Sequence, residues 1–564
     1  MQVQKKVVPG RASDVTGVAV AARWVGRDPA RARDRAALAV PLAFGVVLLV
    51  ALVLRMVGIA YDYPFLLEVD ETRVYQATVR MMAAHSLDPH FYAYGLLLVY
   101  IEALWLLPYV LVRGLLGHPG MPTVTYYGSG MAATSDPLMH VYGRVPFVLL
   151  GVSAVWLAFL IGRRLAGPWA GLLAAALLAL SPLHIAQSHY VLPNAPTGFF
   201  TLLTVWETLR YLAAPREAAA STVRVAGWRG WLTRQLGGEP IGLILAVVAA
   251  ALGAAIKYNA VVVLMTPLLA VVLRRRQDGA RVVVRSCLRV CVVAAIVFLI
   301  VTPPAWSNPV AFVHGAGYEL KHYAVIGGSG SQGGPSIVWY GRYLVEQEGL
   351  LVFPLAVIGL AVLAWQRRQQ IDLVLLMAIA AYYLLIGVQK VHFERNLLVI
   401  LPLLSVACAY ALGRLARLRW PLGLVVSAML AAVALVSLAR GSVDQARAFA
   451  ATPAPLVVRS WLQEHLPRGA SLIADGYTVP PLDRPDVTMT YIDNVRLTPD
   501  QLRDRGVRFV ALAKSFDYYE GDPRRLSSPH ATMAPVYGDG GIMVFEVVDR
   551  SARRRDAPGV ERKG

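Results

Sequence analysis

The chain has 564 residues, of which 57% are hydrophobic and 16% charged, and its mean hydropathy is +0.53. A soluble protein of this length divides into several domains with charged surfaces, whereas this sequence carries repeated apolar runs of roughly 16–25 residues, about long enough to cross a hydrocarbon core of roughly 30 Å. The formal charge of +19 does not indicate nucleic acid, because residues 440–564 carry 18 Lys+Arg against 16 Asp+Glu and the excess lies in short loops between apolar runs, as the positive-inside rule expects.

The first apolar run, 36–60, follows a polar and basic N-terminus, residues 1–35. It is longer than the core of a signal peptide, so it is predicted as an uncleaved span that begins inside the cell. Counted from there, the basic loops between the later runs all fall on the inner side of the membrane. The Ala- and Arg-rich usage favours a bacterial plasma membrane. The predicted spans are 36–60, 143–162, 167–182, 193–212, 241–256, 259–273, 282–303, 349–365, 371–388, 396–413 and 420–438.

A long outer loop, residues 61–142, opens with the charged segment Leu67-Glu68-Val69-Asp70-Glu71-Thr72-Arg73. Apolar residues at helical spacing follow, so Asp70 and Glu71 are predicted at the start of a helix that lies on the membrane. Acidic residues at that position are favoured by the helix dipole in any protein. The functional alternative is a carboxylate that acts as general base on an acceptor hydroxyl.

The apolar stretch 94–112 in the same loop is predicted as a helix at the outer interface. Counting it as a span would break the charge alternation, and it contains Glu102, which is costly in lipid. The preceding His90-Phe91-Tyr92 segment is an aromatic membrane boundary by composition. A second outer loop holds His184 and His189, but no cysteine or nearby carboxylate completes a metal site there. No cofactor is therefore assigned, and a divalent cation stays an alternative.

Two further segments place cations on the outer side. Lys257, followed by Tyr258, interrupts an apolar stretch and must reach the interface or meet an anion. Residues 389–396 hold Lys390, His392 and Arg395, which could clamp a phosphate; the alternative is a polar loop in which Glu394 pairs with Arg395. Between them, the loop 304–348 carries the glycine-rich Gly327–Gly334, predicted as a mobile flap.

After the last span, residues 440–549 are predicted as a small extracytoplasmic α/β domain, with a disordered tail at 550–564. Its expected elements are a helix at 455–465, a strand at 471–475, a helix at 499–505 and a strand at 507–513. The cysteines Cys287, Cys291 and Cys408 lie in apolar runs and are expected to be packing residues.

An acid pair and several cations are thus predicted on one side of the membrane. The outer compartment lacks ATP and nucleotide sugars, so a transferase there needs an energised donor delivered through the lipid. A base for the acceptor and cations for a phosphate leaving group are what such chemistry requires.

The sequence resembles the GT-C membrane glycosyltransferases, nearest to the branch of dolichyl-phosphate-mannose protein mannosyltransferases and bacterial aminoarabinose transferases. The resemblance covers roughly residues 36–440. The motifs that carry it are Asp70-Glu71, His90-Phe91-Tyr92, Arg144, Ser181-Pro182-Leu183-His184, Ser188-His189-Tyr190, Lys257-Tyr258-Asn259 and Phe393-Glu394-Arg395.

This resemblance implies a GT-C helical domain at 36–439, a polyprenyl-phosphate sugar donor, an inverting displacement, and a lipid, glycan or protein acceptor. It implies Asp70 as base with Glu71 in support, and Lys257, Lys390, His392 and Arg395 as donor-phosphate candidates. It also implies a set of residues that bind the acceptor or substrate: His90, Tyr92, His189, Tyr190, Asn194 and Tyr258.

One position departs from the family pattern, since relatives often carry an Asp where this chain has Asn194, and an amide cannot act as a base. Two other functions therefore stay open: a transporter or flippase for lipid-linked sugars, and a non-catalytic protein that binds them. Against the transporter, the sequence shows no matching pair of interrupted half-chain repeats.

Overall fold

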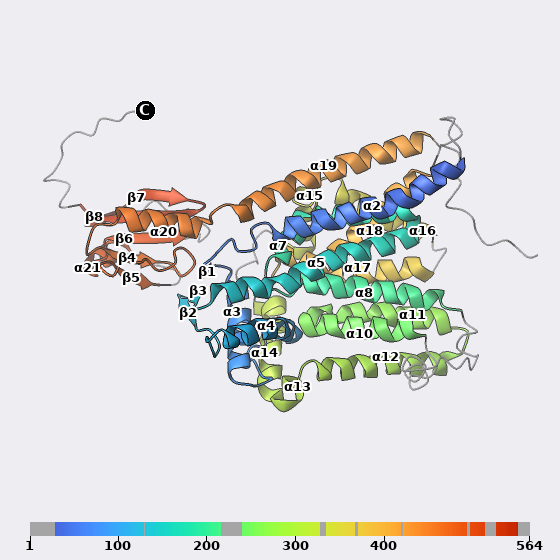
Figure 1. Ribbon diagram of the computed structural model, residues 1–564, viewed down its shortest axis with the longest axis horizontal. Helices are drawn as coiled ribbons and strands as arrows, with labels where there is room; N and C mark the ends of the chain where they lie inside the picture. The colour runs from blue at the N-terminus through green and yellow to red at the C-terminus, as the bar shows by residue number, and fades with distance from the viewer. Residues whose placement is uncertain are drawn as a thin grey trace, which may run out of the picture.

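A computed structural model describes residues 29–128, 130–215, 240–326, 334–366, 370–418, 421–492, 497–513 and 526–550. Within them the chain forms a bundle of long helices with a smaller α/β domain at one end (Figure 1). The start of the predicted basic N-terminus, most of the predicted flap at 327–334 and the predicted tail from 551 lie outside the described residues.

The bundle helices are apolar along most of their length, so they can bury their backbone hydrogen bonds in lipid. Every one of the predicted spans coincides with a helix, and the predicted α-helical membrane fold is confirmed. The helices are α2 (Pro29–Met56), α5 (Pro137–Ala166), α6 (Pro168–Ala179), α8 (Asn194–Ala213), α10 (Ile241–Ile256), α11 (Met265–Arg275), α12 (Ala280–Ile300), α16 (Val352–Gln366), α17 (Gln370–Gly387), α18 (Leu401–Leu415) and α19 (Leu422–Ala450).

Length and composition alone make six described helical stretches fit to cross a membrane, or seven if α6 and the short helix α7 (Pro182–Ser188), bent by 62°, count as one span. Four of the remaining apolar helices, α10, α16, α17 and α18, are shorter. The last helix, α19, continues to Ala450, past the predicted end at 438, because no proline follows the helix start before Pro453.

Two breaks in the bundle place polar groups at the same end of it. At the first, Pro182 begins α7 and the Ser181 side chain caps it by accepting from the His184 amide. At the second, Lys257 is extended between α10 and the 3-10 segment η2 (Tyr258–Leu264). Broken backbone of this kind is tolerated in a membrane protein where neighbouring groups satisfy it.

The predicted outer loop folds into α3 (Val69–Ala83), α4 (Leu97–Leu115) and a small antiparallel sheet of β1 (Phe65–Leu66), β2 (Val124–Tyr127) and β3 (Met131–Thr134). Figure 1 shows α3 and α14 (Pro309–Lys321) running across the end of the bundle rather than along it. In α4 the costly Glu102 is fully buried and accepts a hydrogen bond from Thr78 Oγ1 at 2.6 Å, so it is shielded from lipid. The helix is itself long and apolar enough to span a membrane, so its interfacial placement stays a prediction.

The remaining short elements belong to connections at the same end as α3. They are α13 (Pro304–Ser307), the π-helical η3 (His322–Ile326), α15 (Ser336–Glu346) and the 3-10 segment η4 (Glu394–Val399).

The C-terminal domain is a five-stranded sheet in the order β5-β4-β6-β8-β7, with helices on both faces. Residues of β4 alternate between two cores: Leu472 faces α20 and Ile473 faces α21. The predicted helices and strands at 455–465, 471–475, 499–505 and 507–513 are confirmed, whereas β5 and the β7–β8 hairpin were not expected. The elements are α20 (Ala454–His465), β4 (Ser471–Ala474), β5 (Thr488–Tyr491), α21 (Pro499–Asp504), β6 (Phe509–Ala513), β7 (Ala531–Asp539) and β8 (Ile542–Asp549).

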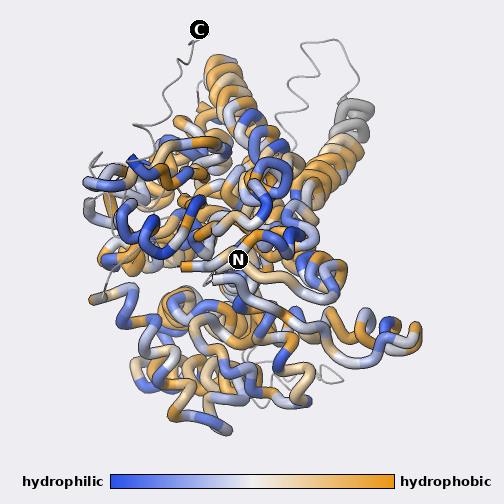
Figure 2. The backbone as a smooth tube through the Cα atoms, turned by 90° about the vertical axis from the view of Figure 1, so that its left-hand side faces the viewer, coloured by the Kyte–Doolittle hydropathy of each residue, from blue (hydrophilic) through white to orange (hydrophobic). Residues whose placement is uncertain are grey.

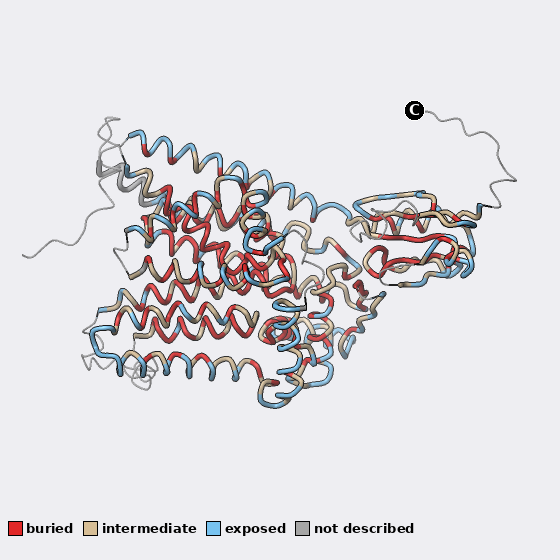
Figure 3. Tube along the Cα trace, turned by 180° about the vertical axis from the view of Figure 1, so that it is seen from behind, coloured by how far each residue is buried: buried red, intermediate tan, exposed pale blue. Residues whose placement is uncertain are grey.

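This domain contacts the small sheet of the outer loop. The rings of Tyr127 and Tyr491 lie 6.0 Å apart, and the Arg459 guanidinium lies over the Phe65 ring. Figure 2 looks along the bundle from this end, where hydrophilic stretches lie in the domain and loops that face the viewer and the helices are mostly hydrophobic. Figure 3 shows the main buried region along the middle helices and a second one inside the C-terminal sheet.

Candidate active site

The centre of the site is an ion pair between two segments far apart in sequence. Asp70 lies in the first turn of α3, where the helix dipole favours an acid, and Arg395 lies in the first turn of η4. The Asp70 Oδ2 and Arg395 Nη2 atoms are 3.0 Å apart, with the side chains 22% and 23% exposed. Both groups are therefore partly accessible at the protein surface, and the guanidinium also lies over the Phe393 ring at 4.4 Å.

Three residues that the sequence did not single out surround this pair. Tyr94 hydrogen-bonds to Asp70 and Tyr323 to Arg395, and burial raises the pKa of both phenols. Burial also raises the pKa of Glu68 to about 7, with the carboxylates of Asp70 and Glu71 acting in the same direction. The signal for Glu68 was its place in the same charged segment, whereas nothing local pointed to Tyr94 or Tyr323.

A second cation, Lys257, lies at the break between α10 and η2. Its Nζ donates to Asn194 Oδ1 at 3.0 Å and to Asn396 Oδ1 at 2.8 Å. Both partners are neutral, and each amide is oriented by its own donation, to Gln187 Oε1 and to the Tyr340 hydroxyl respectively. Because Asn396 follows Arg395 directly, the two cations lie close together, and no described carboxylate forms an ion pair with Lys257.

The carboxylate next to Asp70 has a very different environment. Glu71 is 1% exposed and accepts two hydrogen bonds from Arg144, at 2.9 and 2.6 Å, and one from the Val191 amide. Arg144 also binds Asp62 through two further bonds of 2.8 Å. Burial alone would raise the pKa of Glu71, but Arg144 and His140 outweigh it and hold that pKa well below its ordinary range.

Among the described residues, Asp62, Glu71 and His140 form a group whose spacing could hold a metal ion. The Arg144 guanidinium, however, already binds both carboxylates and supplies the opposing charge. These residues therefore form a buried ionic network that ties α3 to α5, and a metal would have to displace the arginine to bind there.

Comparisons with known proteins agree with this architecture. The sequence profile of the dolichyl-phosphate-mannose-protein mannosyltransferase family matches residues 139–238, which include Arg144 and the segment from Ser181 to Asn194. The oligosaccharyltransferase AglB from Archaeoglobus fulgidus, solved with an inhibitory peptide and a dolichol-phosphate, aligns with a TM-score of 0.52 at 11% identity, over 91% of this chain and 74% of that one. The fold is that of the GT-C glycosyltransferases.

Two further solved structures align with the chain. The same archaeal enzyme in its apo form aligns with a TM-score of 0.50 at 12% identity, over 90% of this chain and 74% of that one. ArnT from Cupriavidus metallidurans, bound to undecaprenyl phosphate, aligns with a TM-score of 0.49 at 13% identity, over 90% of this chain and 97% of that one. No curated protein sequence matches the chain.

Within the GT-C fold, His189 is held in the protein interior. Its two ring nitrogens lie 2.9 Å from the carbonyl oxygens of Ile185 and Val57, and its ring stacks on Phe449 of α19 at 3.9 Å. Tyr190, which follows, packs near the same Phe449 ring. Both ring nitrogens of His189 face backbone carbonyl oxygens, and a neutral ring donates to one of them, so the predicted acceptor contact would require the ring to move.

The predicted residues of the first outer loop adopt several roles. His90 is exposed at a positive φ of 50°, while the Tyr92 hydroxyl donates to Asp88 at 2.7 Å. Asn308 also donates to Asp88, which ties this loop to the start of α14. Tyr258 donates to the carbonyl oxygens of Tyr94 and Tyr92, and so fixes the loop against the break beside Lys257.

The other two phosphate candidates contact residues other than Asp70. Lys390 is exposed, and its Nζ donates to the Val325 carbonyl at 2.9 Å. His392 is buried, with Nδ1 3.0 Å from Ser336 Oγ and its ring against Trp339. Of the four predicted cations, Arg395 contacts Asp70, and Lys257 lies near Arg395 through its hydrogen bond to Asn396.

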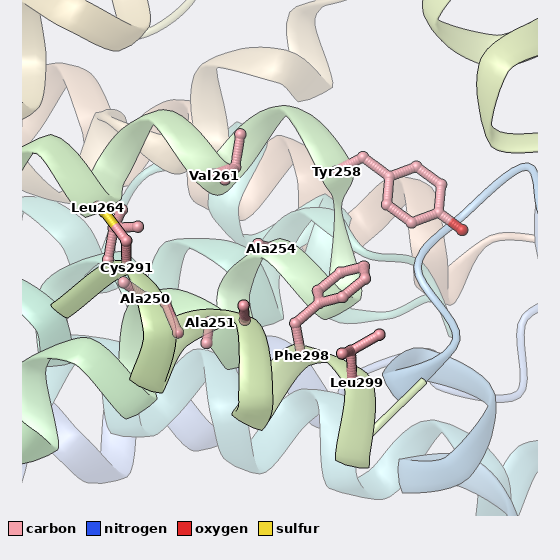
Figure 4. Close-up of a pocket in the computed structure, with 11 residues that line it drawn as sticks. Ala250, Ala251, Ala254, Tyr258, Val261, Leu264, Cys291, Phe298 and Leu299 are labelled. Atoms are coloured by element: carbon pink, nitrogen blue, oxygen red, sulfur yellow. The ribbon is translucent and has the colours of Figure 1, made fainter. Parts of the chain in front are cut away.

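An apolar groove begins next to Lys257 and runs along the bundle between α10, η2 and α12 (Figure 4). Tyr258 and Phe298 lie at one end and Cys291 and Leu264 at the other, so the groove extends from the site toward the middle of the bundle. Its lining is almost wholly apolar: Ala250, Ala251, Ala254, Tyr258, Val261, Leu264, Cys291, Ala294, Ala295, Phe298 and Leu299.

Proposed function

We propose that this protein is a glycosyltransferase that moves a sugar from a polyprenyl-phosphate donor to an acceptor on the outer side of a bacterial plasma membrane. The observation that carries the proposal is the contact between the Asp70 carboxylate and the Arg395 guanidinium, with Lys257 beside them. A base for the acceptor and cations for a phosphate leaving group are the two requirements of this reaction. The GT-C fold supports the same reaction class.

In the proposed reaction, the donor phosphate binds Arg395 and Lys257. The phosphate competes with Asp70 for the guanidinium, so donor binding leaves the carboxylate free to accept a proton. The acceptor hydroxyl gives its proton to Asp70 while its oxygen attacks the anomeric carbon. The bond between that carbon and the phosphate oxygen breaks, and the polyprenyl phosphate leaves with the electron pair, stabilised by the two cations.

Lys257 suits this role because it has a charge without a fixed counter-charge. The amides of Asn194 and Asn396 orient the ammonium group but do not neutralise it. An aspartate at position 194 would instead form an ion pair with Lys257. The presence of Asn194 in place of an aspartate therefore fits a phosphate-binding Lys257 in this chain. Asn194 itself takes no proton in the proposed reaction.

The remaining predicted residues are assigned by their surroundings. We propose that the lipid chain of the donor lies along the apolar groove beside Tyr258, whose chemistry matches an isoprenoid. Glu71 holds α3 in place through Arg144 rather than reacting. The acceptor-side candidates stay His90, Tyr92 and Tyr190. His189 precedes Tyr190 and packs against the same Phe449 ring, so it helps to position that tyrosine. The 389–396 loop is held by Lys390 and His392.

The test is sugar transfer in proteoliposomes that contain the full chain and radiolabelled polyprenyl-phosphate sugars. The lipid phosphate that co-purifies with the protein, identified by native mass spectrometry, selects the donor. Asp70→Asn is expected to reduce transfer about 1,000-fold, within the range of general base catalysis. Asp444→Asn, an exposed acid on α19 that pairs with Arg447, is the matched control and should keep full activity.

Three other results would count against the proposal. Undiminished transfer in Asp70→Asn would remove that carboxylate from the mechanism. Movement of intact donor across the bilayer without transfer would favour the flippase alternative. Donor binding without turnover against lipid, glycan and peptide acceptors would favour the non-catalytic alternative.

A further inference from the structure

A row of three arginines lies on α12, at the end of the bundle opposite the candidate active site. Arg281, Arg285 and Arg289 follow one another at four-residue spacing, so they share one face of the helix. All three are exposed, and none has a hydrogen bond or an ion pair with any residue that the structure describes. Nearby basic residues differ: Arg274 donates to the carbonyl oxygens of Tyr211 and Ala214, and Arg275 pairs with Asp278.

These arginines point toward lipid rather than into the protein. Val284, Leu288 and Val292, which lie beside them on the helix, are 57%, 60% and 55% exposed. Figure 1 shows α12 at the edge of the bundle, and Figure 3 shows exposed residues along it. At about 1.5 Å per residue, Arg289 lies about 14 Å from the start of the helix at Ala280. A guanidinium there needs an anion, because an unpaired charge among apolar side chains is costly.

An apolar surface adjoins the row where α12 packs against α10. Val290 and Val293 of α12 meet Leu243, Ile244 and Val247 of α10 in a shallow groove. Ser286 and Arg289 also line this groove, whose apolar residues are mostly buried in the contact between the two helices. The exposed apolar side chains of Leu288 and Val292 continue along α12 from the arginines, so this face presents cationic groups next to hydrocarbon, which matches an amphipathic anion and not a free one.

We propose that this surface binds an anionic phospholipid. The headgroup phosphate contacts Arg285 and Arg289, Arg281 adds positive charge, and one acyl chain lies along the exposed Leu288 and Val292. Basic pockets between membrane helices bind anionic headgroups by the same physics. The site is distinct from the donor site, because the arginines lie in the first half of α12, at the end of the bundle opposite α3 and α14 (Figure 1).

The test is a titration of the full chain in phosphatidylcholine nanodiscs with phosphatidylglycerol, read by native mass spectrometry of the bound lipid. At about fivefold per arginine, the triple change Arg281→Gln, Arg285→Gln and Arg289→Gln should weaken phosphatidylglycerol binding about 100-fold. The triple change to Lys keeps the charge and should stay within tenfold of the wild type. Arg163→Gln, an exposed arginine at the same end of α5, is the matched control and should bind normally.

Several outcomes would overturn the proposal. These are wild-type binding by the triple Gln variant, an equal loss in the triple Lys variant, or an equal loss in Arg163→Gln. Equal retention of phosphatidylcholine would show that charge plays no part, and competition by inorganic phosphate at the same concentration would show that the acyl chain plays none. The melting temperature of each variant, measured in phosphatidylcholine alone, separates loss of binding from loss of folding.

Discussion

Asp70 and Glu71 are neighbours in one helical turn, yet they belong to two different kinds of ionic site. Asp70 meets Arg395 in a single, partly exposed ion pair, and Lys257 beside it has only neutral partners. Glu71 is buried and fully hydrogen-bonded to Arg144, which also binds Asp62. The comparison shows that two neighbouring carboxylates can differ greatly in how many bonds they have already made: Asp70 has one charged partner and stays partly exposed, whereas Glu71 is buried and its bonds hold α3 in place.

The largest expected effect breaks the buried network. Arg144→Met leaves the carboxylates of Asp62 and Glu71 buried without the arginine that balances their charge, which should destabilise the protein by about 3–5 kcal/mol. The expected result is little folded protein in detergent, measured by size-exclusion chromatography and thermal unfolding. Arg163→Met changes an exposed arginine in the same helix and should fold normally. Wild-type melting of Arg144→Met would show that the network is not what holds α3 to α5.

The next effect concerns binding at the reactive site. Lys257→Met should weaken the binding of polyprenyl phosphate about 30-fold or more, because the phosphate loses a desolvated charge partner. Affinity is measured by native mass spectrometry in nanodiscs. Lys390→Met, an exposed lysine of the outer connections that donates to a backbone carbonyl, should bind as the wild type does. Equal weakening in both variants would mean that Lys257 does not bind the phosphate directly.

A smaller effect is expected from Asn194→Asp, which gives Lys257 a counter-charge. The new carboxylate should compete with the phosphate and lower its affinity about 5–10-fold, as a nearby charge does at an intermediate dielectric. Asn194→Ala removes the amide without adding charge and should have less effect on affinity. If Asn194→Asp instead increased sugar transfer, a carboxylate there would take part in the reaction.

The smallest effect is a pH dependence at Glu68. Its pKa is raised to about 7 in the folded protein, so the folded state binds a proton more tightly than the unfolded state does. Its contribution to stability is therefore lost as the pH rises from about 4.5 to about 7. Glu68→Gln should raise the melting temperature by about 1–2 °C at pH 8 and leave it unchanged at pH 4.5. An equal shift at both pH values would exclude ionisation as the cause.

The sequence predicted the parts of this fold that depend on local pattern. Apolar runs and basic loops located the helices, and the first-turn acids located the start of α3. Charge at the outer loops also suggested that Asp70 and Arg395 would meet, which they do.

Contacts between residues far apart in the sequence could not be predicted from local pattern. Nothing in the segment around Asp70 distinguishes it from Glu71; the distinction comes from Arg144, on another helix. The amides that hold Lys257 come from α8 and η4, and an asparagine in isolation carries no sign of its partner. The pairing of β5 with β4 also depends on contacts between separated segments, whereas the β7–β8 hairpin had a local signal in its Gly540-Gly541 turn that was missed in the sequence.

The Phe449 ring on α19 has a mechanical consequence. It is stacked on His189 near the outer end of the helix, and only Ala451, Thr452 and Pro453 separate α19 from α20 of the C-terminal domain. A rotation of that domain about this short linker would therefore move α19 and its Phe449 ring, which contacts the rings of His189 and Tyr190. A ligand that reorients the C-terminal domain is therefore expected to shift the segment that holds Tyr190 as well.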